Sequence, residues 1–76
     1  MKELVEFMAA GLVDNPDAVE VHEEDEGGRI VYHLYVADDD MGKVIGKQGR
    51  IANALRDLLK VAAARNGARV SLEIGH

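Results

Sequence analysis

Cysteine, tryptophan and threonine are absent from this 76-residue chain, and proline and serine occur once each. A chain without cysteine forms no disulfide and offers no thiolate to a substrate or a metal, which fits a reducing compartment. Ser71 is the only serine, and the nearest histidine in sequence is the terminal His76. Because no nucleophile–base pair is apparent, we expect that the protein is not an enzyme.

Long apolar runs are missing as well. No stretch approaches the about 20 apolar residues that a membrane-spanning helix needs, and Glu3 and Glu6 interrupt the region where a signal peptide would carry its apolar core. We therefore expect a cytoplasmic protein with no membrane partner. The length fits one domain over residues 1–76. So small a chain buries only about 60% of its unfolded surface, and a partner would add stability.

Metal ligands are few and scattered. His22, His33 and His76 follow no metal-binding spacing, and the two on predicted strands face away from the core. The run Asp38-Asp39-Asp40 offers carboxylates, but it directly precedes a predicted helix. A helix N-terminus favours acidic residues and accepts aspartate as a cap. We predict neither a metal site nor any other cofactor.

Charge is distributed unevenly along the chain. The net charge of -5 has the wrong sign for a protein that binds a polyanion, yet seven of the nine basic residues lie between Met41 and Arg69. That stretch contains a single acidic residue, Asp57, whereas the rest of the chain carries thirteen. Such asymmetry indicates a polyanionic partner, unless the basic residues merely form a solvated helix face.

Apolar periodicity and turn residues predict three helices and three strands. Helices are expected over residues 3–12, 41–45 and 50–65, and strands over 18–24, 30–37 and 69–74. The buried stripe of the longest helix is predicted to be Ile51, Leu55, Leu58 and Ala62. A Gly-Gly turn makes the first two strands antiparallel, and the intervening helices let the last strand lie parallel to the second.

The predicted fold is α+β, in the order α-β-β-α-α-β, with a three-stranded mixed sheet and its helices on one face. This arrangement leaves the other face of the sheet bare, and Val31, His33 and Tyr35 would lie there. Exposed apolar or aromatic side chains on such a face can mark an interface.

A Gly-x-x-Gly loop, Gly46-Lys47-Gln48-Gly49, separates the apolar pair Val44-Ile45 from the helix that begins at Arg50. Glycine permits backbone angles that other residues avoid, so the main chain can approach a ligand closely. The N–H groups at a helix N-terminus suit a phosphate. Lys43 and the cationic residues of the loop add full charges at this point. The pattern predicts a binding site for a phosphodiester backbone.

The run from Val44 to Ile51, within this order of elements, resembles the KH (K-homology) RNA-binding domain. A helix and strand over residues 3–24 precede the core βααβ unit over residues 29–76, which is the type II arrangement, and the chain is similar to the small bacterial KH proteins of the KhpA-like family. The resemblance implies a groove for about four unpaired nucleotides. Matched residues would hold the RNA backbone (Gly46, Lys47, Gln48, Gly49), form an apolar floor (Val44, Ile45, Ile51) and contribute polar contacts at the rim (Arg50, Asn53, Arg69).

The same resemblance implies an RNA chaperone or post-transcriptional regulator, involved in cell-envelope and cell-shape control, that acts alone or with a larger KH-containing protein. A weak homodimer or such a heterodimer is expected. A different class of function stays open, in which the KH scaffold mainly dimerises or binds proteins. Nucleotide hydrolysis is disfavoured, because Lys47 is followed by no serine or threonine that could reach a magnesium ion.

Overall fold

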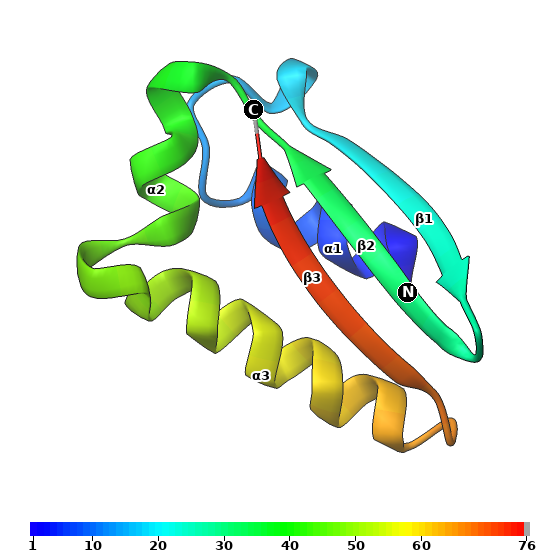
Figure 1. Ribbon diagram of the computed structural model, residues 1–76. Helices are drawn as coiled ribbons and strands as arrows, with labels where there is room; N and C mark the ends of the chain where they lie inside the picture. Colours follow the sequence, from blue (N-terminus) through cyan, green and yellow to red (C-terminus); the bar gives the residue numbers. More distant parts are fainter. Residues whose placement is uncertain (76) are drawn as a thin grey trace.

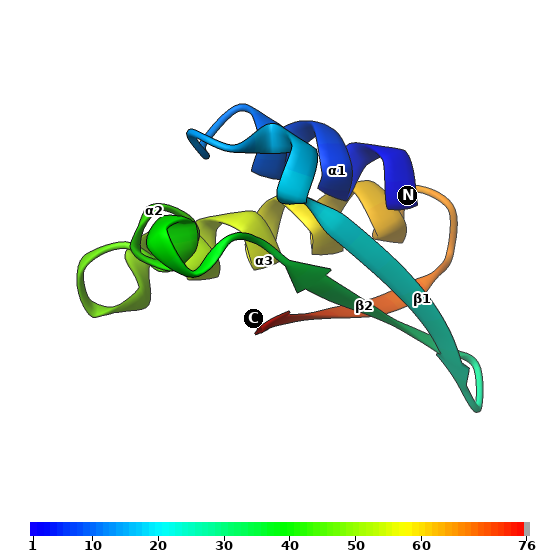
Figure 2. The same ribbon diagram turned by 90° about the horizontal axis from the view of Figure 1, so that it is seen from above.

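Three helices lie on one face of a three-stranded sheet in the computed structural model, which describes residues 1–75 (Figures 1 and 2). The helices are α1 (Lys2–Ala10), α2 (Met41–Ile45) and α3 (Arg50–Ala64), and the strands are β1 (Glu20–Glu26), β2 (Arg29–Tyr35) and β3 (Arg69–Gly75). Short 3₁₀ turns occupy Pro16–Ala18, Asp38–Asp40 and Lys47–Gly49. The α+β class and the order α-β-β-α-α-β are confirmed. Within the described residues, no helix combines the length and apolarity that crossing a membrane requires.

The sheet has the strand order β1-β2-β3 and is mixed, as predicted. β1 and β2 are antiparallel, with Glu26 opposite Arg29, and β2 and β3 are parallel, with Arg29 opposite Arg69. Gly27 and Gly28 both have positive φ (64° and 91°), the backbone that a two-residue hairpin turn requires. β1 is an edge strand with five acidic residues, and charged side chains on an edge oppose pairing with another chain. β3 leaves its outer edge open beside α3 (Figure 1).

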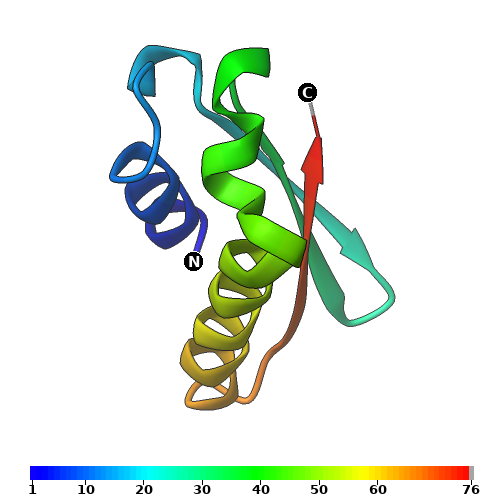
Figure 3. The same ribbon diagram turned by 90° about the vertical axis from the view of Figure 1, so that its left-hand side faces the viewer.

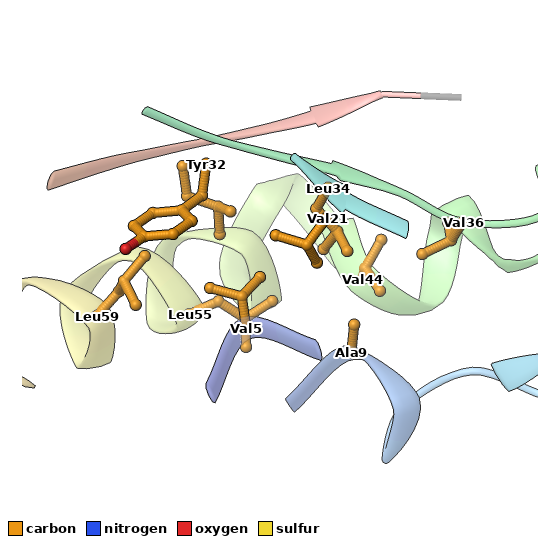
Figure 4. Packing of buried hydrophobic residues seen from close by; sticks show 10 residues of the cluster. Val5, Ala9, Val21, Tyr32, Leu34, Val36, Val44, Leu55 and Leu59 are labelled. Atoms are coloured by element: carbon orange, nitrogen blue, oxygen red, sulfur yellow. The ribbon is translucent and has the colours of Figure 1, made fainter. Parts of the chain in front are cut away.

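The core lies between the sheet and the helices. Val5 and Ala9 of α1 face Val21, Tyr32 and Leu34 of the sheet (Figure 4). α2 and α3 lie beside α1 on the same face of the sheet and complete the core. The buried cluster comprises Val5, Ala9, Val21, Tyr32, Leu34, Val36, Val44, Leu55, Leu59 and Leu72. One face of each strand therefore supplies the apolar layer, and its alternation is the pattern visible in the sequence.

The buried stripe of α3 differs from the predicted one. It consists of Ala52, Leu55, Leu59 and Ala63, whereas Leu58 is 59% exposed. Both sets of residues repeat at helical spacing, so periodicity alone does not decide between them. The stripe with alanines at both ends lies against the sheet, because small side chains allow the helix axis to approach closely.

The sheet face opposite the helices is less bare than predicted. Val31 is only 5% exposed, since it lies on the central strand between Glu24 of β1 and Ser71 of β3. His33 Nε2 lies 3.1 Å from Glu24 Oε1, and Tyr35 makes an edge contact with the ring of His22. The prediction that Val31 is an exposed apolar group on this face is wrong, and Tyr35 remains its exposed aromatic residue.

Asp40 does not cap α2 with its side chain as predicted. It is 2% exposed, and its carboxylate accepts hydrogen bonds from the amide N–H groups of Asp14 (3.2 Å) and Asn15 (3.0 Å), which follow α1. Burial raises the pKa of the Asp40 carboxyl, but these two amides and the Lys43 ammonium outweigh it and hold the pKa below its ordinary value. Asp40 thus fastens the segment after α1 to the start of α2.

Candidate nucleic-acid interface

The Gly46–Gly49 loop joins α2 to α3 through backbone conformations that favour glycine. Gly46 has φ 76° and ψ 176°, a region that side-chain-bearing residues avoid. Gln48 (φ 58°) and Gly49 (φ 75°) are left-handed. Three positive φ values within four residues turn the chain sharply between α2 and α3, and Figure 1 shows this tight loop at the start of α3.

The two loop glycines are required for different reasons. A Cβ built on Gly46 would lie 2.6 Å from the side chain of Ile51, whereas a Cβ on Gly49 would meet nothing within 4 Å. Glycine is therefore needed at position 46 both for its positive φ and to leave space for the Ile51 side chain, whereas at position 49 it is needed only for its positive φ.

We expect Gly46→Ala to destabilise the protein by about 3 kcal/mol, from backbone strain and the clash with Ile51. Gly49→Ala, the matched control, should cost only about 1 kcal/mol, because left-handed backbone is the sole penalty. Urea denaturation of both variants tests this, with the Ile51 methyl NMR signals as a local readout. Equal losses of stability would contradict the role assigned to the Gly46–Ile51 contact.

Hydrogen-bond donors and positive charge converge at this loop. Lys47, Gln48 and Arg50 are exposed. The amide of Gly49 donates to Gly46 O and that of Arg50 to Lys47 O, whereas the amides of Lys47 and Gln48 have no acceptor within residues 1–75. Two consecutive N–H groups that have no acceptor in the described protein, beside two cations, suit an anion.

The apolar floor predicted next to the loop is only partly accessible. Ile45 and Ile51 are half-buried and present one side to solvent. Val44 is 0% exposed and belongs to the core, so the prediction that it lies under a ligand is wrong. α2 is only five residues long, and Val44 is the side chain that it buries against the core. Because this contact holds α2 in place, Val44 is not available to a ligand.

Lys43 is also placed differently from the prediction. Its Nζ lies 3.0 Å from Asp14 Oδ2 and 3.4 Å from Asp40 Oδ1. The Asp14 carboxylate, followed by that of Asp40, raises the pKa of the Lys43 ammonium. The charge of Lys43 is thus largely compensated by these carboxylates, and its main contact is with the segment after α1.

In Figure 3, α2 and α3 form a column between α1 and β3. A groove lies between α3 and the open edge of β3, where a cavity of about 100 Å³ is lined by Arg56, Leu59, Lys60, Val70, Ser71 and Leu72. Arg56 Nε donates to the carbonyl of Leu72 (3.1 Å) and its Nη1 to Asn53 Oδ1 (3.3 Å). The peptide groups of successive residues in a strand point to opposite edges of that strand. The carbonyl groups of Val70 and Ile74 therefore point to the same open edge of β3 as the carbonyl of Leu72.

Arg56, Lys60 and the edge of β3 were missed as individual site residues by sequence reasoning. The signal that could have found them is helical spacing: Asn53, Arg56 and Lys60 recur at i, i+3 and i+7, on the side of α3 next to its buried stripe. Arg69, in contrast, lies outside the groove. It alternates with Val70 and Leu72 and so faces the opposite side of the sheet, beside Arg29.

A family model described as "KhpA/KhpB, KH domain" matches residues 2–74. The chain belongs to this KH-domain family. The resemblance inferred from the Gly-x-x-Gly run is thereby confirmed, and α1 and β1 precede the βααβ unit as in a type II KH domain. KH domains of this family are not enzymes, in agreement with the prediction.

Several similar proteins carry the name "RNA-binding protein KhpA". The protein from Caldanaerobacter subterraneus subsp. tengcongensis is 58% identical over 74 residues, which cover 97% of this chain and 99% of the relative. The one from Halalkalibacterium halodurans is 54% identical and covers 97% of both chains. The one from Chlamydia pneumoniae is 47% identical over 97% of this chain and 95% of the relative.

Proposed function

We propose that this KH protein binds single-stranded RNA in the groove formed by the Gly46–Gly49 loop, α3 and the open edge of β3. The observation that carries the proposal is the pair of free amides at Lys47 and Gln48, beside the N-terminus of a 15-residue helix and two exposed cations. Membership of a KH family whose relatives are named RNA-binding proteins supports it.

In this proposal the loop holds phosphates and the groove reads bases. Lys47, Gln48 and Arg50 contact the backbone, and bases lie on Ile45 and Ile51. No aromatic residue adjoins the loop, so the bases are held by aliphatic contact and by hydrogen bonds to their edges. The open edge of β3 presents peptide groups to those base edges, and Arg56 must leave the Leu72 carbonyl before a base can take its place.

The expected dependence on salt tests this function. If about three phosphates are neutralised, the log–log slope of the binding constant against salt for a single strand should be roughly -2. A fluorescence-anisotropy titration with an unstructured RNA of about five nucleotides, from low to moderate salt, measures the slope. A slope near zero would contradict the phosphate contacts, and one near -6 would require far more cations than the groove presents.

We further propose that the protein acts in the cytoplasm as an RNA chaperone or post-transcriptional regulator. As the family resemblance implies, this activity would contribute to the control of cell shape. The same resemblance supports a homodimer, or a heterodimer with a larger KH-containing protein.

A protein-interaction module is the second candidate, and one observation favours it. Phe7 on α1 is 78% exposed, and Leu58 and Val61 on α3 are each 59% exposed. Exposed apolar side chains that lie together can mark a protein interface, and Leu58 and Val61 share one side of α3 because they are three residues apart. A salt-independent interaction, together with concentration-dependent sedimentation of the free protein, would favour this function over RNA binding.

A further inference from the structure

A second cationic site lies at the opposite end of α3 from the glycine loop. The hairpin turn and the start of β3 border a cavity of about 380 Å³, lined by Glu26, Gly27, Gly28, Arg29 and Arg69. Arg29 and Arg69 are direct neighbours in the parallel register of β2 and β3, and both are exposed. Their side chains leave the same face of the sheet, since each is first in its strand and the two are paired.

Two like charges placed side by side destabilise a sheet unless something compensates them. Within residues 1–75, neither guanidinium has a carboxylate within ion-pair distance, and neither donates a hydrogen bond to the protein. Glu26 also lines the cavity, on the β1 side of Arg29, without reaching it. The pair thus retains its donors for a ligand from solvent.

We propose that Arg29 and Arg69 bind a phosphate of the RNA strand as it leaves the groove, so that the footprint extends past the groove onto the hairpin end of the sheet. This inference rests on the proposed RNA-binding function. An arginine fork matches phosphate geometry, and two forks can hold one phosphodiester group from both sides.

The two cavities lie on either side of the edge strand β3. Val70 lines the groove cavity, and the adjacent Arg69 lines the hairpin cavity on the opposite face of the sheet, so an RNA strand that leaves the groove reaches the arginine pair by passing over this open edge. Lys60 lies on the groove wall beside Val70, so cations mark a path from Lys47 through Arg56 and Lys60 to the arginine pair. The start of β3 lies beside the hairpin end of β2, since Arg69 is opposite Arg29 in the register of the two strands. The acidic residues of β1 repel a polyanion and confine this path to the β3 side of the sheet.

The test compares one RNA of about five nucleotides with the same RNA carrying about six abasic residues on its 5′ or its 3′ side. Abasic residues add phosphates without adding bases, so they create no extra binding registers in the groove. At low salt we expect one of the two extensions to tighten binding about ten-fold, with a salt slope more negative by about 0.7 for each added phosphate contact.

The double variant Arg29→Gln/Arg69→Gln should lose this gain and keep its affinity for the unextended RNA. It should fold about as stably as the parent, because it removes both the like-charge neighbours Arg29 and Arg69 and the opposite-charge neighbours Glu26 and Arg29. The control Lys2→Gln/Arg65→Gln, with the same change in net charge, should retain most of the gain. A gain that persists in the double variant, or that the control loses equally, would overturn the proposal. If the parent protein binds neither RNA, the groove function itself fails; if it binds both equally, only the extended footprint fails.

Discussion

Replacing Lys47 and Gln48 together by aspartate is expected to weaken binding to a short unstructured RNA by at least about a hundred-fold. The substitution removes one cation and places two carboxylates beside the two free amides of the loop, where the proposed phosphates lie. Repulsion of phosphate, added to the lost contacts, accounts for the size of the effect. Aspartate tolerates the left-handed backbone of Gln48, and both side chains are exposed, so folding should be preserved.

Arg65→Asp/Asn66→Asp provides a matched control. Arg65 and Asn66 are also a neighbouring basic and amide residue, both exposed, but they lie at the other end of α3. The change in charge is identical, and we expect less than a three-fold effect on the short RNA. Fluorescence anisotropy gives the affinities, and far-UV circular dichroism checks the fold. A folded Lys47/Gln48 variant with parental affinity would eliminate the loop as a phosphate site.

Removing the Asp40 carboxylate should give the largest loss of stability among the three consecutive aspartates. In Asp40→Ala, the amides of Asp14 and Asn15 lose their acceptor, and Lys43 loses one of its two carboxylate partners. Buried groups left without a partner are more costly than the same groups exposed. We expect the thermal midpoint to fall by on the order of 10 °C. Asp38→Ala and Asp39→Ala, at exposed positions with the same charge change, should shift it by about 2 °C or less.

The pH dependence of stability gives an independent check on Asp40. Its pKa is lower in the folded than in the unfolded protein. The carboxylate therefore contributes stability above the ordinary carboxyl pKa, and this contribution is lost as the pH falls through the lowered folded value. The stability difference between the parent and Asp40→Asn should be largest near neutral pH and shrink in acid. A difference that does not change between pH 7 and pH 3 would contradict the assigned hydrogen bonds.

Local patterns in the sequence were sufficient for the secondary structure, the element order and the family. Alternation of apolar residues predicted the strands, and the Gly-Gly pair predicted the hairpin turn, because these features depend on neighbours within a few residues. The Gly-x-x-Gly loop was predictable for the same reason. Its positive φ values are properties of those four residues and the helix that follows.

Only the tertiary structure decided which residues of each element face the core and which charges are free. Periodicity on α3 fits two adjacent stripes, and close packing against the sheet selected the one that contains Ala52 and Ala63 and left Leu58 outside. Nothing in the local sequence predicts which basic side chains are paired with a carboxylate. Lys43 forms an ion pair with Asp14, which is distant along the chain, whereas Arg29 lies beside Arg69 of β3. Charge pairing across the fold depends on contacts between distant segments, and no local pattern encodes them.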